Sequence, residues 1–300
     1  MIPDRVLAWA QQELDRPIRS VERVGGGLTN TISAIHFADG DPVILRHVSI
    51  ARWGEVGRQH VLCEALGCRL MAESGLPTPQ LIASETDGSQ TGAYVNLTTW
   101  LPGRVRLGPL GVEAIEALAT AAVIIHATPA SPDDRPRPYA FWAPAEPQVP
   151  SWARHPRLWQ RAIDLFAGEA PATRPGLIHR DFHPGNVLWQ GDNITGVIDW
   201  AETSWGPADL DVTHTLTNFA MLHDLRRAEA FSTAYRRHGG IVEADPDAAR
   251  FWQVSDILGF LPDPALQLAA LIEARPVLNE QILRQRLEHL LSITMEPPRG

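Results

Sequence analysis

The stretch from residue 177 to residue 200, "LIHRDFHPGNVLWQGDNITGVIDW", decides how this sequence folds. Its first half places two histidines, an arginine, an aspartate and an asparagine in one loop. Its second half contains two apolar runs, "NVLWQ" and "ITGVIDW", separated by "GDN", which is the pattern of a β-hairpin. A polar loop of this kind is typical of a metal site, a catalytic loop or an ordinary turn, and the spacing of its residues discriminates among the three.

A metal site is the first interpretation. His179, Asp181 and His183 alternate along the chain, so in a strand they would share one face and bind zinc or iron. The proline and glycine at 184–185 interrupt such a strand, and no further cluster of histidine and acidic residues has ligand spacing. A metal-dependent hydrolase that uses His179 and His183 is therefore the weaker alternative. An ordinary loop, with His179 as a hydrogen-bonded core histidine, leaves the neighbouring residues unexplained.

The third interpretation is a phosphoryl-transfer loop. Kinases carry His-Arg-Asp, four residues and Asn in their catalytic loop, and here these are His179, Arg180, Asp181 and Asn186. The spacing assigns to Asp181 the role of catalytic base, which accepts the proton of a substrate hydroxyl. Asn186 would hold Mg²⁺, and Asp199 on the next hairpin strand supplies a second metal ligand. The set of three is more specific than any single triplet, and it predicts a kinase.

The same stretch closely resembles the aminoglycoside phosphotransferase-like kinases, which are relatives of choline kinase and the protein kinases. The resemblance covers most of the chain and implies an α+β, bilobal protein-kinase-like fold, with a small β-rich N-lobe that contains one key helix and a larger, mainly helical C-lobe. It implies ATP or GTP as the donor, Mg²⁺ as the cofactor and a small-molecule hydroxyl as the acceptor. His179 matches the position that supports the loop. Asp211, in "GPADLD", matches an aspartate that secures the loop from the following helix.

The order of the predicted elements agrees with two lobes. Residues 1–100 have the pattern of several strands and one helix, at about 59–74, and form the expected nucleotide-binding N-lobe. "LPG" at 101–103 breaks this pattern and is the expected hinge. Residues 101–300 form the expected C-lobe, which carries the catalytic loop and the acceptor site. Its pattern is mostly helical, with helices predicted at 112–127, at 152–167 and between 208 and 292.

The N-lobe contains candidate residues for nucleotide binding. "VGGGLTN" resembles the family's nucleotide loop, in which Gly25, Gly26 and Gly27 let backbone N–H groups approach the phosphates. It is not a Walker A motif, because the Gly-Lys-Ser/Thr end is absent. Main-chain groups at Thr99 and Leu101 are expected to bind the edge of the base, so side chains there do not discriminate ATP from GTP.

Arg46 stands on the third strand, where kinases usually carry a lysine. The chain contains no lysine at all, so any cation that binds phosphate must be an arginine, a histidine, a backbone N–H group or a metal. Arginine offers a permanent charge and a planar fork of donors. Glu64 lies on an otherwise apolar helix face and needs a partner, which we expect to be Arg46, with Arg58 and Arg69 as rivals.

The acceptor site is expected near Asp181. His183 stands two residues after it, where protein kinases commonly use lysine. Trp200, Glu202 and Trp205 follow the predicted metal ligand and are candidates for contact with the acceptor.

The composition of the chain indicates which classes of partner it can bind and where in the cell it is expected. The net charge of -9 argues against nucleic acid and against anionic membranes. The two cysteines are five residues apart on a predicted helix, and the N-terminus has no signal-peptide pattern, so we expect a cytoplasmic protein with reduced thiols, as a monomer or homodimer. The alternative to an active kinase is a pseudokinase, which would bind nucleotide without catalysing transfer. The presence of Arg46 where kinases usually carry a lysine favours this alternative.

Overall fold

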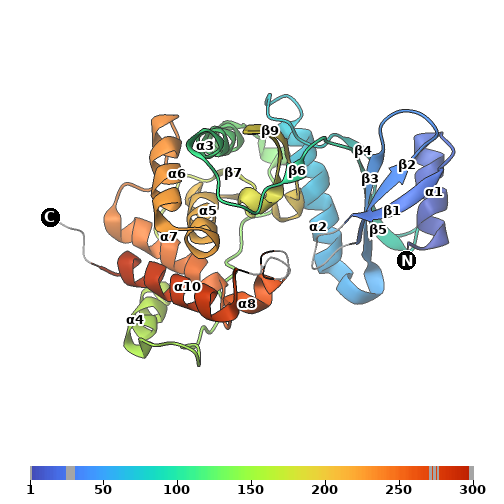
Figure 1. Ribbon diagram of the computed structural model, residues 1–300. Coiled ribbons are helices and arrows are strands. Elements are labelled where there is room, and N and C mark those ends of the chain that lie inside the picture. The colour runs from blue at the N-terminus through green and yellow to red at the C-terminus, as the bar shows by residue number, and fades with distance from the viewer. Residues whose placement is uncertain (1, 25–30, 270–271, 273–274, 276, 297–300) are drawn as a thin grey trace.

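The computed structural model describes residues 2–24, 31–269, 272, 275 and 277–296. A β-sheet built from the first hundred residues lies at one end of the molecule, and a larger helical part lies at the other (Figure 1). The helix α2 (Ile50–Met71) lies between them. The expected α+β fold, with a β-rich N-terminal part and a mainly helical C-terminal part, is confirmed.

The N-terminal sheet has five antiparallel strands in the order β1-β2-β3-β5-β4. Its centre is formed by β3, which pairs with β2 on one side and β5 on the other. Alternate side chains of β3 face opposite sides, so Leu45 packs against α1 whereas its neighbour Arg46 faces α2. The strands are β1 (Ser20–Val24), β2 (Thr31–His36), β3 (Val43–Ser49), β4 (Leu81–Glu85) and β5 (Ala93–Thr99).

The expectation of one helix in this part is wrong, because a second helix, α1 (Asp4–Leu14), precedes the sheet. Val6, Trp9 and Ala10 follow the spacing of one helix face and are buried against the sheet. The helix α2 also begins at Ile50, earlier than predicted, since it continues through a kink at Gly54, whose φ is 47°. Both helices place apolar stripes on the sheet, one on each face (Figure 1).

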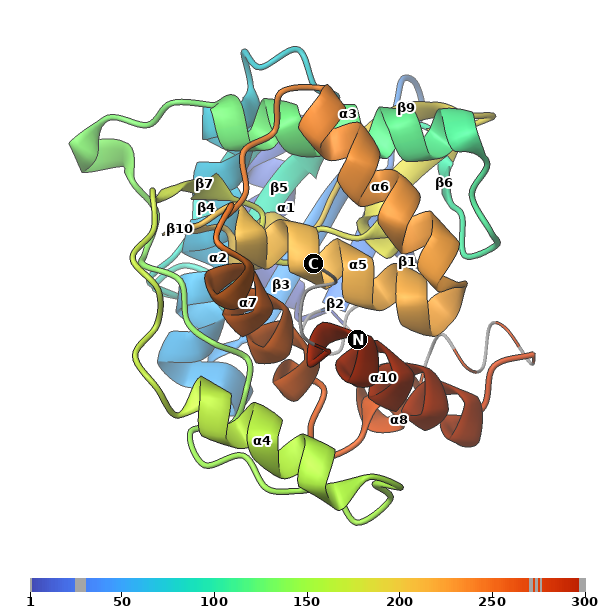
Figure 2. The same ribbon diagram turned by 90° about the vertical axis from the view of Figure 1, so that its left-hand side faces the viewer.

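The C-terminal part surrounds α5 with other helices. Figure 2 shows α5 between α6, α7 and α10, and α3 crosses beside α6. The helix predicted from residue 152 begins instead at Pro156, a position where proline is favoured because its missing N–H has no partner in a first turn. The helices are α3 (Val112–Ala127), α4 (Pro156–Phe166), α5 (Asp209–Leu222), α6 (Leu225–Arg237), α7 (Pro246–Gly259), α8 (Pro264–Gln267) and α10 (Glu280–Thr294).

Two small sheets carry the catalytic loop. The predicted hairpin is formed by β8 (Val187–Gln190) and β9 (Asn193–Val197), and β6 (Arg104–Val105) adds a third strand. A second pair joins β7 (Gly176–Ile178), which leads into the loop, to β10 (Ser204–Gly206).

The five-stranded sheet ends at Thr99, and the division into lobes at residue 100 stays a prediction. Cys63 and Cys68 are both free and buried. Among the described helices, none is both long and apolar enough to cross a bilayer.

Candidate active site

The carboxylate of Asp211 on α5 holds the predicted catalytic loop, which follows β7, through hydrogen bonds to its backbone. One oxygen of this carboxylate accepts the backbone N–H of His179 at 2.8 Å, and the other accepts that of Arg180 at 2.6 Å. The side chain of His126 lies 3.0 Å away and is itself hydrogen-bonded to the hydroxyl of Tyr235. Burial would raise the pKa of Asp211, but the hydrogen bond and charge of His126 lower it. Asp211 therefore has the geometry of the predicted loop support.

The backbone is strained at two points of the site. Arg180 has φ of 71° and Asp199 has φ of 65°, which is the left-handed region that residues other than glycine adopt at a cost. The guanidinium of Arg180 donates to the carbonyl of Ala140 at 3.0 Å and lies 3.9 Å from the centre of the Trp142 ring. These contacts, together with the hydrogen bond from the backbone N–H of Arg180 to Asp211, stabilise the turn that precedes Asp181.

His179 connects the loop to the segment that precedes Asp199. Its Nε2 donates to the carbonyl of Ile198 at 3.0 Å, and its Nδ1 accepts the backbone N–H of Asp181 at 3.3 Å. The side chain is completely buried, with its ring against that of Trp200. Both ring nitrogens are therefore used inside the fold. His179 has the place predicted for loop support, and the paired metal site of His179 and His183 is not formed.

Asp181 and Asn186 lie together, as the spacing predicts. The amide of Asn186 donates to the carboxylate of Asp181 at 3.0 Å and to its main-chain carbonyl at 2.9 Å. The carboxylate is 30% exposed, so it is held but remains open to a substrate. Burial would raise the pKa of Asp181, but the hydrogen bond and the positive charge of His214 hold it well below its usual range. Asp181 is therefore ionised.

Asp199 lies just beyond the end of β9 instead of within the strand, as was expected. The backbone N–H of Ile198 donates to the carbonyl of Asn186 at 2.9 Å, which brings Asn186 and Asp199 to the same open end of the hairpin. The donors available there are a carboxylate, 29% exposed, and an amide oxygen, and oxygen ligands are those that Mg²⁺ prefers. The two residues therefore fit a Mg²⁺ site.

Arg46 of the sheet bridges two carboxylates, one on α2 and one at the end of the hairpin in the helical part. Its Nε lies 2.8 Å from Glu64 of α2, and its Nη2 lies 2.9 Å from Asp199. Burial would lower the pKa of Arg46, but Asp199 and Glu64 raise it, so the guanidinium is permanently charged. The amide of Asn96 donates to the second oxygen of Glu64 at 2.8 Å. The expected ion pair of Arg46 and Glu64 is present, and Arg58 pairs with Glu55 instead.

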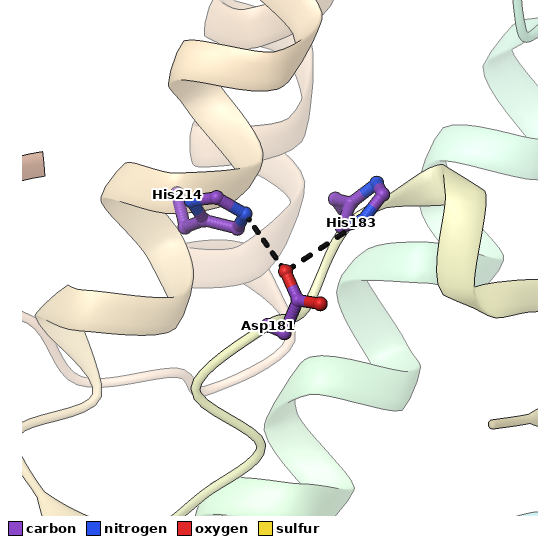
Figure 3. Close-up of side chains that lie close together, drawn as sticks. All are labelled: Asp181, His183 and His214. Atoms are coloured by element: carbon purple, nitrogen blue, oxygen red, sulfur yellow. Dashed lines mark ion pairs between the residues drawn. The ribbon is translucent and has the colours of Figure 1, made fainter. Parts of the chain in front are cut away.

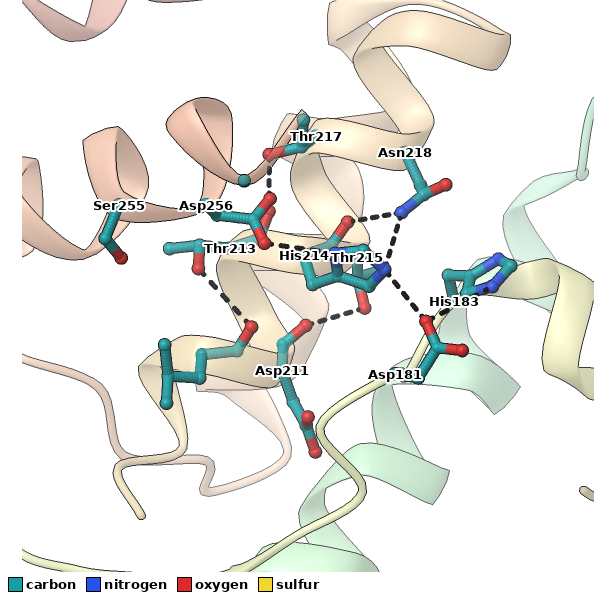
Figure 4. A network of polar contacts seen from close by, with 12 residues as sticks. Asp181, His183, Asp211, Thr213, His214, Thr215, Thr217, Asn218, Ser255 and Asp256 are labelled. Atoms are coloured by element: carbon teal, nitrogen blue, oxygen red, sulfur yellow. Dashed lines mark hydrogen bonds and ion pairs between the residues drawn. The ribbon is translucent and has the colours of Figure 1, made fainter. Parts of the chain in front are cut away.

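A histidine that the sequence reading missed lies against the carboxylate of Asp181. The Nε2 of His214 is 3.1 Å from Asp181, and its Nδ1 is 3.0 Å from Asp256 of α7 (Figure 4). Phe260 stacks on the imidazole and the edge of Trp142 contacts it. A signal was present: His214 lies in a helix whose polar side chains are nearly all buried, and a buried polar group needs a partner.

The four acceptor candidates have different surroundings. His183 contacts Asp181, and burial lowers the pKa of His183 to about 4, so the imidazole is neutral at neutral pH. The prediction for the side chain of Trp200 is wrong, because it is completely buried and its N–H donates to the carbonyl of Val197. Glu202 forms ion pairs with His60 and Arg137, and the Trp205 ring lies under Arg135. For Glu202 and Trp205, acceptor contact stays a prediction.

Three side chains, Asp181, His183 and His214, bring ligand atoms within 4.8 Å of one another (Figure 3). Distance alone would fit a metal ion, but the hydrogen bonds do not. The Nδ1 of His183 accepts the backbone N–H of Gly185 at 3.1 Å, so in the neutral ring the proton is on Nε2, the atom that faces Asp181. A nitrogen that carries a proton cannot bind a metal, and this cluster therefore fits a hydrogen-bonded network better.

The remaining candidates for nucleotide binding lie on the sheet side. Gly25, Gly26 and Gly27 lie outside the described residues. The N–H of Thr99 donates to the carbonyl of Gln80 at 2.9 Å. Leu101 follows the end of β5, and its side chain lies over Gly196, which has no Cβ to obstruct it. The roles of these residues toward a base stay predictions.

Comparisons with known proteins agree with this geometry. Residues 20–252 match the sequence model of the phosphotransferase enzyme family. No curated protein sequence matches the chain. The fold is similar to the crystal structure of aminoglycoside phosphotransferase APH(4)-Ia, with 18% identity, a TM-score of 0.62, and coverage of 98% of this chain and 99% of that one.

Two further solved structures are similar over nearly their whole length. Amicoumacin kinase hAmiN, in complex with AMP-PNP and Ca²⁺, has 13% identity and a TM-score of 0.65, with 99% of this chain and 96% of that one covered. Macrolide 2'-phosphotransferase MphH from Brachybacterium faecium has 16% identity and a TM-score of 0.59, with 98% and 99% covered. At these identities the likeness shows the fold. The family match spans most of the sequence and confirms the resemblance: the chain belongs to the phosphotransferase enzyme family.

Proposed function

We propose that this enzyme transfers the γ-phosphoryl group of ATP or GTP to a hydroxyl of a small molecule, with Mg²⁺ as its cofactor. One observation carries the proposal. Arg46 joins Glu64 to Asp199, and Asp199 lies at the same hairpin end as Asn186, which binds Asp181. Base, metal ligands and phosphate-binding cation are thus connected in one chain of contacts. Few functions other than phosphoryl transfer need this combination.

In this proposal Asp181 orients the acceptor. Its ionised, partly exposed carboxylate accepts a hydrogen bond from the acceptor hydroxyl and takes the proton as the new O–P bond forms. The bond between the γ-phosphorus and the leaving nucleoside diphosphate breaks in the same step. Since phosphoryl transfer requires little covalent chemistry from the protein, most of the rate enhancement comes from position and charge.

Asn186 and Asp199 would hold Mg²⁺ through an amide oxygen and a carboxylate. When bound, the ion neutralises the charge of the phosphate oxygens. Arg46 adds a fixed positive charge beside Asp199, and the Gly25 to Gly27 loop is proposed to contact the phosphates through backbone N–H groups. Thr99 and Leu101 are proposed to border the base.

The acceptor is proposed to be a small polyhydroxylated or amino-substituted molecule. One similar structure contains hygromycin B, and the similar enzymes include an amicoumacin kinase and a macrolide 2'-phosphotransferase, so antibiotics of these kinds belong in the first panel of candidates. Sugars and amino alcohols complete the panel, because a shared reaction does not fix the substrate. The neutral imidazole of His183 is proposed to donate a hydrogen bond toward the transferring group or the acceptor.

The test is a thermal-shift screen of acceptors with Mg²⁺ and a nonhydrolysable nucleotide, followed by product detection with ATP and with GTP. A pseudokinase would bind nucleotide and yield no phosphorylated product with any acceptor.

The variant Asp199→Asn tests whether Asp199 is a metal ligand, because it should weaken Mg²⁺-dependent nucleotide binding. If that variant keeps the Mg²⁺ dependence of the wild type, Asp199 is not a metal ligand.

A further inference from the structure

The imidazole of His214 lies between two carboxylates that come from different elements. Asp181 in the catalytic loop is 3.1 Å from Nε2, and Asp256 of α7 is 3.0 Å from Nδ1. Figure 4 shows the three side chains in a row, with α5 in the middle. The side chains of His214 and Asp256 are 6% and 1% exposed, whereas that of Asp181 is 30% exposed. The row therefore leads from the protein interior to the open side of the catalytic loop.

The two carboxylates favour protonation of both nitrogens of His214. A neutral imidazole has one N–H group, so one of its nitrogens would direct a lone pair at a carboxylate oxygen. Only the imidazolium donates to both carboxylates. The amide nitrogen of Asn218 also lies 3.0 Å from Nε2, and it donates to the main-chain carbonyl of His214 at the same distance. Toward Nε2 this amide is a second donor, so it favours a lone pair there, whereas Asp181 favours the proton. A charge-assisted hydrogen bond to a carboxylate is the stronger of the two. Asp256 is buried and needs a counter-charge, which the imidazolium supplies.

The charges around the ring agree with this assignment. Burial would lower the pKa of His214, but Asp256 and Asp181 raise it to about 9. His183 is the other titratable group that contacts the ring, and it is neutral because burial lowers its pKa to about 4. The guanidinium of Arg180 also interacts electrostatically with both carboxylates. No described residue of α6 or α10 contacts the imidazole through a charged group, so the two carboxylates dominate.

We propose that Asp256 and His214 are positioning residues that fix the orientation of the Asp181 carboxylate through a protonated imidazole. This inference rests on the proposed function. His214 holds Oδ1 of Asp181, and Asn186 holds Oδ2, so the carboxylate cannot rotate and each oxygen keeps one lone pair for the acceptor hydroxyl. During transfer the hydroxyl proton goes to Asp181 and then to solvent, while His214 keeps its own proton.

The arrangement has a consequence for pH dependence. When the imidazolium loses a proton, it can no longer donate to both carboxylates, and Asp181 loses one of its two anchors. Phosphoryl transfer should therefore decline at alkaline pH as His214 titrates. Replacing Asp256 with asparagine removes one of the two charges that keep His214 protonated, so the decline should move toward neutral pH.

The experiment compares four proteins: wild type, His214→Gln, Asp256→Asn and the control Thr213→Val. Thr213 is buried on the same helix, and its hydroxyl bonds only to main-chain carbonyls of α5. For each protein, kcat and KM for nucleotide are measured from pH 6 to 10 with a working acceptor. Separately, NMR of ¹³C,¹⁵N-histidine-labelled protein follows the titration of His214, whose signal is identified by its absence in His214→Gln.

We expect His214→Gln to lower kcat about 10- to 100-fold, as for a misplaced catalytic group, with KM for nucleotide nearly unchanged and the alkaline decline absent. Asp256→Asn should move the decline by roughly one pH unit or more toward neutral, and its NMR titration by the same amount. Thr213→Val should match the wild type. The inference is overturned if His214 titrates like a free imidazole, or if His214→Gln keeps the wild-type kcat and pH profile. A wild type without transfer to any acceptor contradicts the proposed function instead, and the NMR result still decides whether the imidazole is doubly protonated.

Discussion

The Nη2 of Arg46 lies 2.9 Å from Oδ1 of Asp199, although the two residues are 153 positions apart in the chain. The contact joins β3 of the sheet to the end of the hairpin in the helical part. Because Arg46 also binds Glu64, α2 is tied to the same point. The proposed phosphate-binding cation and metal ligand are thus positioned by one guanidinium, which a lysine with its single nitrogen could reproduce only in part.

Loss of this guanidinium should lower both the free energy of unfolding and the affinity for nucleotide. Arg46→Met leaves Glu64, which is 7% exposed, as a buried carboxylate without its cation, and removal of one partner of a buried pair costs about 3–5 kcal/mol. Urea unfolding should show this loss, and nucleotide affinity should fall with it. Arg46→Lys should lose less of both. The control is Arg237→Met, whose arginine is 59% exposed in its pair with Glu116 and should leave stability nearly unchanged. Wild-type stability in Arg46→Met would mean that the bridge is unimportant.

The close approach of α2 to the short turn that follows the hairpin, at 200–203, leads to a second prediction. A Cβ added at Gly67 would lie 2.7 Å from the hydroxyl of Thr203 and 3.0 Å from Cβ of Trp200, so Gly67→Ala should destabilise the fold by about 1–3 kcal/mol. Since Glu64 lies one turn earlier in the same helix, nucleotide affinity should also fall. Gly108→Ala, where nothing lies within 4 Å of the added atom, is the matched control. Equal unfolding midpoints for the two variants would refute the packing argument.

Stability should depend on pH through His214. Its pKa is raised from the ordinary histidine value of 6.5 to about 9 in the folded protein, so the folded state binds this proton more tightly than the unfolded chain does. The contribution is fully present below pH 6.5 and is lost as the pH rises through about 9. At about 1.36 kcal/mol per pKa unit, the free energy of unfolding should fall by on the order of 3 kcal/mol across this window. His214→Gln should not show this fall. Parallel curves for the two proteins would contradict the assignment.

Much of the site could be predicted from local sequence. The interval from Asp181 to Asn186, and the hairpin that carries Asp199 just beyond its second strand, depend on turns only a few residues long. Glu64 was paired correctly with Arg46 by a simple physical argument, because a lone carboxylate on an apolar helix face needs a cation.

His214 and Asp256 each need a partner for the same reason, but the sequence does not show that they pair with each other. His214 stands in a buried helix and Asp256 follows "FWQVS" on another, but no sequence interval relates them, since α5 and α7 meet only in the folded protein. Trp200 was misplaced for a related reason. Its position beside the proposed metal ligand indicated contact with the acceptor, whereas the turn at Asp199 directs the ring into the core.

The most direct test of the account is the magnesium-dependent transfer of labelled γ-phosphate to an acceptor by the wild type and by Asp181→Asn. Asparagine keeps the shape of the side chain but removes the charge that accepts the hydroxyl proton. We predict product from the wild type, a loss of about 100-fold or more in kcat for the variant, and nucleotide affinity within about twofold of the wild type. A fully active Asp181→Asn would contradict the assignment of Asp181 as the catalytic base, and with it the mechanism proposed for this site.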